Sequence, residues 1–185
     1  MSKAAPLETR ALVRIALFAA LMGMLGLVPP IHLLFIAGVP ITAQSLVVMM
    51  AGLTLGGRDG ALAIALFLLV VALGAPLLSG GRGGLGVFFG PTAGFLAGYV
   101  AGAFATGWFA ARLPGPRPLA DFLGAVLGGI GVVYLIGVPA FAAIAQVPLA
   151  KALAGSAVFI PGDLLKAVVA TLAARSLAQA GLARR

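Results

Sequence analysis

The sequence of 185 residues has no cysteine, one histidine (His32) and only four acidic residues. Without cysteine the chain cannot form disulfides, thiolate metal sites or a cysteine nucleophile. So few histidines and carboxylates cannot supply an HExxH zinc site, a paired-aspartate site or a Ser-His-Asp triad. The P-loop motif G-x-x-x-x-G-K-[ST] is missing as well, so we do not expect the chain itself to hydrolyse ATP. These absences argue against an enzyme, and we expect no metal and no cofactor.

Charge is scarce too, because charged residues make up 9% of the chain, hydrophobic residues make up 62% and the mean hydropathy is +1.19. Soluble domains carry about 25% charged residues. The composition therefore predicts an integral membrane protein with the lipid bilayer as its solvent. The net charge of +8 does not indicate nucleic-acid binding, because the basic residues are scattered between apolar runs and form no stripe with interleaved aromatics.

Apolar runs separated by glycine, proline and charge predict six transmembrane helices in a single domain over residues 1–185. Their approximate ranges are 11–28, 42–55, 61–78, 91–111, 119–136 and 161–179. The second run is short for a full span, so it either begins earlier, near Gly38, or crosses a locally thinned bilayer. The fold class expected is an all-α membrane bundle.

The basic residues predict the orientation of this bundle. Six spans put both termini on one side, which holds nine basic and three acidic residues, against three basic and one acidic on the other side. The positive-inside rule then places both termini in the cytoplasm and the chain in the inner (cytoplasmic) membrane. The two outward segments, 29–41 and 79–90, are apolar or glycine-rich. Since unpaired backbone cannot face lipid, we expect both to fold as lids over an outward-facing cavity.

Two charges, Asp163 and Lys166, stand in the first turns of the last predicted helix. Residues three apart share a helix face. One interpretation is structural, in which Asp163 caps the helix after Pro161-Gly162 and Lys166 extends to the membrane interface. The other is functional, because a charge at the centre of a span costs about 2.5 to 3.5 kcal/mol and such residues usually face a cavity.

A second candidate, Arg82, lies in the glycine-rich stretch SGGRGGLGVFFG (79–90). The backbone amides of neighbours such as Gly83 and Gly84 can approach a ligand closely there, although Arg82 could also be an interface anchor. Together with Asp163 and Lys166, Arg82 would form a site of net charge +1. Such a site suits a small monoanion with polar N–H groups and an aliphatic part.

Polar residues elsewhere carry less weight. Thr42 and Gln44 stand at the outer start of a predicted span, where they could contact a ligand or end the helix, and Tyr99, at mid-helix, could face the cavity or the bundle. In the first predicted helix, Ala16 and Ala20 have the small-xxx-small spacing that permits close helix approach. This face could meet a partner protein or another helix of the same chain.

Three stretches together resemble the BioY proteins, the biotin-specific S components of energy-coupling factor (ECF) transporters. They are GVPITAQSLVVMMAGLTLG (38–56), GGRGGLGVFFGPTAGFLAGY (80–99) and FIPGDLLKA (159–167). The resemblance implies a six-helix bundle that captures biotin from outside with high affinity and delivers it inward with a transmembrane coupling protein and ATPase subunits. It also implies that Asp163 and Lys166 belong to the binding site, and that Ala16 and Ala20 form the docking motif for the coupling protein.

This resemblance suggests an assignment of ligand groups. Asp163 would accept from the ureido N–H groups of biotin, and Arg82 with the loop amides would bind the carboxylate. Lys166 would support Asp163 or donate to the ureido oxygen, and the reverse assignment, Lys166 on the carboxylate, stays open. Two further functions also stay open: a solitary biotin transporter that works without the ATPase module, and an S component for another vitamin.

Overall fold

The computed structural model of the chain describes residues 9–28 and 42–181. Within these ranges the chain forms helices and no strand beyond one isolated antiparallel bridge between Leu78 and Arg82. The α-helices are α1 (Thr9–Gly26), α2 (Gln44–Leu55), α3 (Gly57–Ala72), α4 (Ala93–Arg112), α5 (Arg117–Gly124), α6 (Val133–Ile144), α7 (Leu149–Ala157) and α8 (Ile160–Gln179). A 3-10 turn, η1 (Leu85–Phe88), precedes α4, and a π-helical segment, η2 (Ala125–Val132), joins α5 to α6. The all-α prediction is confirmed.

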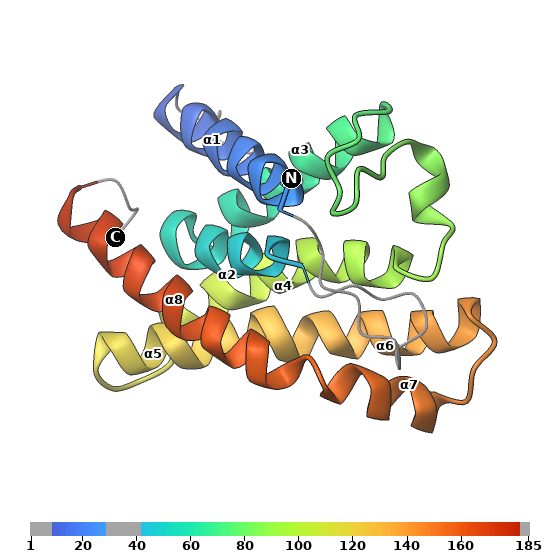
Figure 1. Cartoon of the computed structure of the whole chain (residues 1–185). Coiled ribbons are helices and arrows are strands. Elements are labelled where there is room, and N and C mark those ends of the chain that lie inside the picture. The colour runs from blue at the N-terminus through green and yellow to red at the C-terminus, as the bar shows by residue number, and fades with distance from the viewer. Residues whose placement is uncertain (1–8, 29–41, 182–185) are drawn as a thin grey trace, which may run out of the picture.

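The helices pack in three tiers (Figure 1), with α1 and α3 in the first, α2 and α4 in the second, and the α5–α6 rod with α7 and α8 in the third. The central helix α4 contacts α2, α3, η2 and α6, and α8 packs on α2. Met22, Val47 and Phe67 are fully buried where α1, α2 and α3 meet, and Met49 packs with Ile130 and Ala167 where α2 meets the third tier. This arrangement brings the starts of α2, α4 and α8 close to the middle of the α5–α6 rod.

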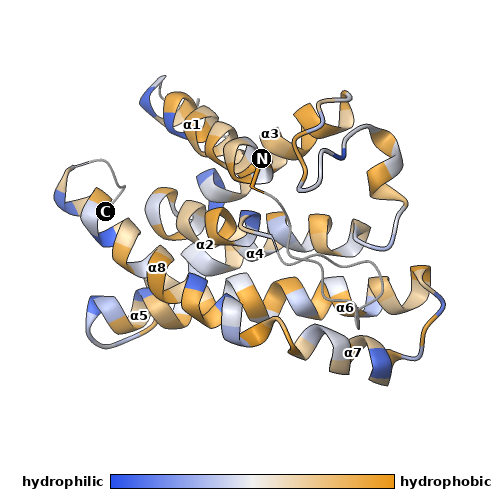
Figure 2. Cartoon of the chain, in the orientation of Figure 1, coloured by the Kyte–Doolittle hydropathy of each residue, from blue (hydrophilic) through white to orange (hydrophobic). Residues whose placement is uncertain are grey.

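The helices are largely hydrophobic along their length, and many of the hydrophilic residues lie near helix ends and turns (Figure 2). Large side chains such as Leu17, Leu135 and Leu172 are exposed, as expected of faces that contact lipid. Three described helices, α1, α4 and the continuous α5–α6 rod (Arg117–Ile144), are long and apolar enough to span a membrane, and the bent pair α7 and α8 would add a fourth. The number of six spans and the cytoplasmic termini stay predictions.

The short helices α2 and α3 differ in their bounds from the second and third predicted ranges. As expected, α2 is short, with 12 residues, and α3 has 16, both below the roughly 20 residues of a full span. Residues 57–60, which lie between the predicted ranges 42–55 and 61–78, already belong to α3, because Gly56 with φ of 83° makes the whole connection to α2. At its other end α3 stops at Ala72, ahead of Gly74 with φ of 108°, and not at 78.

The third tier holds the largest departure from prediction. The α5–α6 rod runs on to Ile144 with Pro139 inside it, whereas the predicted span ended at 136. The sequence reading also missed α7, which follows Gln146, a residue with φ of 56°, and meets α8 at an angle of 51°. The predicted lid 29–41, with Gly38 and His32, lies outside the described residues.

Candidate functional site

A cavity lies where the starts of α2, α4 and α8 face η2 and α6. Its lining combines polar and aromatic side chains from segments far apart in the sequence. The lining residues are Thr42, Gln44, Ser45, Leu78, Arg82, Thr92, Phe95, Leu96, Tyr99, Gly129, Val133, Tyr134, Phe159, Asp163 and Lys166. Six of the predicted site residues, Thr42, Gln44, Arg82, Tyr99, Asp163 and Lys166, are therefore brought together. The two predicted glycines, Gly83 and Gly84, do not line this cavity.

Asp163 occupies the first turns of α8, and its side chain is 9% exposed. Its N–H donates to the Phe159 carbonyl at 2.9 Å, so Asp163 lies within the helix, and the helix start has no side-chain cap. The capping interpretation of Asp163 is thus wrong. The carboxylate accepts three bonds instead: Tyr134 Oη donates to Oδ2 at 2.6 Å, and Lys166 Nζ and Ser45 Oγ donate to Oδ1 at 2.9 and 3.4 Å.

Lys166 turns into the bundle, so the interpretation that it extends to the membrane interface is also wrong. Its side chain is 18% exposed, and Nζ donates to Asp163 Oδ1 at 2.9 Å, to the Thr42 carbonyl at 2.8 Å and to Ser45 Oγ at 3.0 Å. An ammonium has three N–H donors, and these three acceptors use all of them. Lys166 therefore holds Asp163 and the start of α2 in place and has no donor left over.

Arg82 is anchored at one side of the cavity. Its Nε donates to the Ser79 carbonyl at 3.3 Å and its Nη1 to Thr92 Oγ1 at 3.3 Å. These two bonds use two of the five N–H donors of a guanidinium. Because Asp163 and Lys166 neutralise each other, the lining residues carry one net positive charge, that of Arg82. The cavity is thus suited to one anionic group beside Arg82.

The glycine loop serves to place Arg82. Gly84 N–H donates to the Val71 carbonyl of α3 at 2.8 Å, so this amide does not point to a ligand. A Cβ on Gly83 would lie 2.2 Å from the Ala75 carbonyl oxygen, which leaves no room for a side chain there. The two glycines let the loop fold closely onto the end of α3, and the expectation that their amides form part of the cavity wall is not met.

Gln44 lines the cavity, but its side chain hydrogen-bonds only to backbone groups in the described part of the chain. It is 2% exposed. Its Nε2 donates to the carbonyls of Met22 and Leu77, both at 3.1 Å, and its Oε1 accepts from Ser79 N–H at 3.2 Å. Gln44 thus ties α1 and residues 77–79 to the start of α2.

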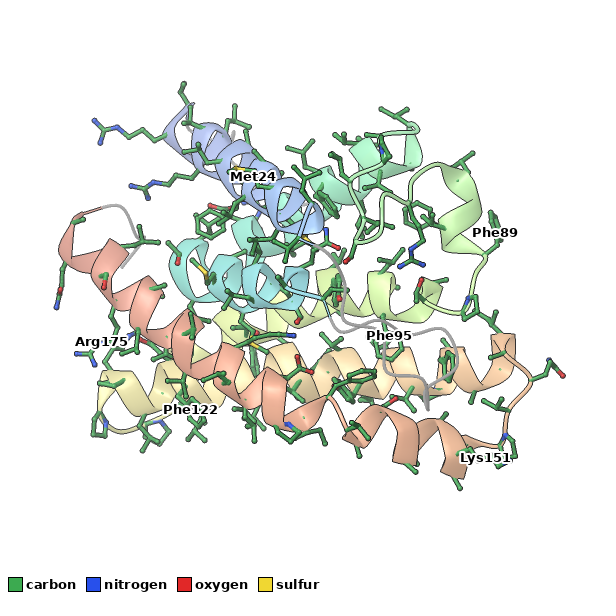
Figure 3. The ribbon with its side chains drawn as sticks, in the orientation of Figure 1. Met24, Phe89, Phe95, Phe122, Lys151 and Arg175 are labelled. Carbon is green, nitrogen blue, oxygen red and sulfur yellow. The ribbon has the colours of Figure 1, made fainter. Side chains whose placement is uncertain are left out.

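Sequence reading missed Ser45 and Tyr134, which both bond to Asp163. Tyr134 is one of only two tyrosines in the chain, and that scarcity in an apolar run was the signal available. Its ring packs edge-on against Phe95 of α4, with centroids 6.1 Å apart, and the label in Figure 3 places Phe95 facing the third tier. The preceding η2 comes very close to its neighbours, since a Cβ on Gly128 would lie 2.2 Å from Thr106 N of α4.

A second concave surface, here named the α1–α3 groove, lies on the outside of the first tier. It is apolar and is lined by Ala16, Ala19, Ala20, Gly23, Met24 and Leu27 of α1, Leu66, Phe67 and Val70 of α3, and Leu77. The two predicted docking residues, Ala16 and Ala20, are both exposed in it. Among the described helices, none covers Ala16 and Ala20, whereas Ala19 and Gly23 of the same helix are buried against the rest of the bundle.

The fold, together with a cavity that polar and aromatic side chains line, defines the chain as a small helical membrane protein with an S-component fold. A solved structure described as the S-component for biotin from an ECF-type ABC transporter is similar to it, with a TM-score of 0.87, 30% identity, and coverage of 94% of this chain and 95% of that one. The chain belongs to the BioY family, whose model matches residues 1–182. The resemblance seen in the sequence is thereby confirmed.

Curated relatives agree with this family. The protein named biotin transporter BioY from Rhizobium etli is 52% identical over 177 residues, which cover 92% of this chain and 94% of the relative. A protein of the same name from Rhodobacter capsulatus is 51% identical over 175 residues, with coverage of 89% and 91%. The similarity thus extends over nearly the whole length of both chains.

Proposed function

We propose that this protein is the substrate-binding subunit of an ECF-type ABC transporter, and that it captures biotin from outside the cell with high affinity. One observation carries the proposal: a neutral Asp163–Lys166 pair and an unneutralised Arg82 line one cavity, in a chain whose curated relatives are named biotin transporters. Biotin matches that arrangement, because it has ureido N–H donors, one carboxylate and an aliphatic chain between them.

The ureido ring is assigned to Asp163. An ionised carboxylate offers about four lone-pair positions, and the bonds from Tyr134, Ser45 and Lys166 take three of them. One position stays open for a ureido N–H, and the Tyr134 oxygen, which donates to Asp163, can accept the other. Lys166 then supports Asp163 in place of binding the ligand, which is the first of the two roles expected for it.

The carboxylate is assigned to Arg82, which has donors beyond its bonds to Ser79 and Thr92. The reverse assignment, Lys166 on the carboxylate, would require Lys166 to give up one of its three short bonds. The amides of Gly83 and Gly84 take no part in this assignment, because neither glycine lines the cavity. Phe95, Phe159 and Val133 supply apolar walls for the bicycle and the aliphatic chain.

The partners proposed are a transmembrane coupling protein and separate ATPase subunits, which would dock on the α1–α3 groove at Ala16 and Ala20. The groove is apolar and open, and small residues on a helix face allow another membrane helix to approach closely. Biotin is the transported substrate and no cofactor is proposed. Both termini are proposed to lie in the cytoplasm, with the cavity facing outward before delivery.

Calorimetry on the purified protein tests this function. Biotin should bind, whereas thiamine and riboflavin should not, and desthiobiotin should bind because it keeps the ureido ring and the carboxylate. Biotin methyl ester should bind more weakly than biotin to the parent, with a smaller difference in Arg82→Ala. An equal difference in both proteins would remove Arg82 from the carboxylate site, and absence of biotin binding would refute the function.

Transport needs a separate measurement. Biotin uptake should depend on coexpression of the coupling protein and ATPase subunits in a host that lacks its own. Equal uptake without them would show that the chain works as a solitary transporter.

A further inference from the structure

One short segment of chain forms part of two separate surfaces. Leu78 lines the cavity, while the residue before it, Leu77, lines the α1–α3 groove. The Leu77 side chain sits against α1, with Cδ1 3.5 Å from the place that a Cβ on Gly23 would take. Any shift of residues 77–79 therefore changes a wall of the cavity and a wall of the groove together.

Gln44 holds this segment from the cavity side. Its amide nitrogen joins the Leu77 carbonyl to the Met22 carbonyl of α1, and its oxygen receives the Ser79 N–H. All three bonds reach residues more than 20 positions away, and Gln44 is 2% exposed. Burial makes these bonds costly to break, because a buried polar group that loses its partner cannot replace the bond with one to water.

The same segment places Arg82. Leu78 N–H donates to the Arg82 carbonyl at 3.0 Å, Arg82 N–H donates to the Leu78 carbonyl at 3.2 Å, and Arg82 Nε donates to the Ser79 carbonyl at 3.3 Å. Arg82 is thus bonded through its backbone and its side chain to residues that Gln44 and α1 hold. A ligand that pulls on the guanidinium acts on residues 78 and 79 directly.

The end of α1 also contacts Leu77 and Gln44. Gly26 is buried, and a Cβ there would lie 1.9 Å from the Leu77 carbonyl oxygen and 2.9 Å from Gln44 Nε2. Only glycine lets α1 approach this carbonyl so closely. The contact therefore links the helix that forms one side of the groove to the segment that carries Arg82.

We propose that Gln44 is a positioning residue that transmits occupancy of the cavity to the α1–α3 groove. The inference rests on the proposed function, in which the biotin carboxylate engages Arg82 and the groove receives the coupling protein. When the carboxylate draws Arg82 inward, residues 77–79 move with it, and the Gln44 bonds carry that movement to Leu77 and α1. Without those bonds, filling the cavity no longer changes the groove.

The natural absence of cysteine allows a direct test. The variant Met24→Cys, at a position that is 66% exposed and lines the groove, carries an environment-sensitive fluorophore on its one cysteine. Saturating biotin should shift its emission in the parent, and the shift should be lost in Gln44→Met, which removes the amide at similar size. Gly26→Ala disturbs the contact of α1 with Leu77 and Gln44 and should also lose the shift. The test therefore does not depend on the folding of one variant.

Two controls separate this role from general damage. Thr171→Val removes a buried bond, Thr171 Oγ1 to the Ala167 carbonyl at 2.8 Å, that stays within α8, and it should keep the shift. In the variant Leu172→Cys, at an exposed position on α8, the same fluorophore should not respond to biotin in any background. Calorimetry on each labelled protein establishes that biotin is bound at saturation.

The outcomes are distinct. An undiminished shift at Met24 in Gln44→Met with biotin bound would overturn the inference, and so would a parent that binds biotin without any shift. A parent that does not bind biotin would refute the proposed function, and the coupling with it.

Discussion

The pair Asp163 and Lys166 allows a quantitative test of the assignment that Lys166 serves Asp163. At an effective dielectric constant of about 20, two unit charges 2.9 Å apart attract by about 6 kcal/mol. Both side chains are mostly buried, at 9% and 18% exposed. Removing one partner of a buried pair usually costs about 3 to 5 kcal/mol, because the other charge is left without compensation. Asp163→Asn and Lys166→Met should each destabilise the protein by about that amount.

The double variant should lose much less free energy of unfolding than the two single variants lose together. With both charges gone, no uncompensated charge remains, so the double variant should recover about 3 kcal/mol relative to additivity. Unfolding of the four proteins in one detergent, without ligand, measures this coupling. Additive losses would refute the reasoning that the ion pair, and not two independent sets of contacts, holds the site.

Biotin binding gives the second part of this test. Lys166→Met should lower the affinity for biotin. The double variant should bind biotin no better than Asp163→Asn, because both lack the carboxylate that accepts from the ureido ring. If Lys166→Met weakened biotin but not its methyl ester, the carboxylate would belong to Lys166, and the present assignment of Arg82 would be wrong.

Three further predictions concern single contacts. Tyr134→Phe removes the 2.6 Å bond to Asp163, and since a hydrogen bond to a charged group contributes about 1.5 to 3 kcal/mol, calorimetry should show biotin affinity lowered by about tenfold or more; an unchanged affinity would place Tyr134 outside the site. Gly128→Ala puts a Cβ 2.2 Å from Thr106 N, so the thermal midpoint should fall, as for a core overpacked at a cost of about 1 to 3 kcal/mol. Gly162→Ala on α8 meets nothing within 4 Å and should be neutral or stabilising by up to about 1 kcal/mol; the opposite order of these two alanine variants would contradict the packing argument.

A helix end could be predicted from the sequence where a residue typical of helix ends, such as glycine, stands there. Gly56, with φ of 83°, directly follows α2 at its predicted end, whereas Gly74, with φ of 108°, follows α3 and the predicted range 61–78 ran past it. The end of the α5–α6 rod lacks such a mark, because Pro139 lies inside α6 and Gln146, a residue that usually avoids positive φ, makes the turn. The missed helix α7 lies directly beyond that turn.

In the candidate site, too, contacts between residues close in sequence could be predicted, whereas contacts between distant residues could not. Asp163 and Lys166 meet because residues three apart share a helix face, and that spacing is visible in the sequence. Tyr134 reaches Asp163 only because the π-helical η2 sets the rotation of α6, and no residue pattern records that rotation. The role of Gln44 is also hidden, since its acceptors are backbone carbonyls 22 and 33 residues away, and every residue has such a carbonyl.

The bend between α7 and α8 explains how two charges reach the interior of an apolar bundle. α7 takes up nine residues before the 51° bend, a length of about 13 Å at 1.5 Å per residue, so α8 and its Asp163 start well inside the third tier. Asp163 bonds to Tyr134, whose ring contacts Phe95, whereas Arg82 bonds to Thr92, about one turn nearer the start of α4. Along α4, the neutral pair thus lies about one turn farther from the helix start than the net positive charge. A ligand with a ureido ring and a carboxylate at opposite ends should therefore enter ring first, with its anionic end left beside the loop that reaches the α1–α3 groove.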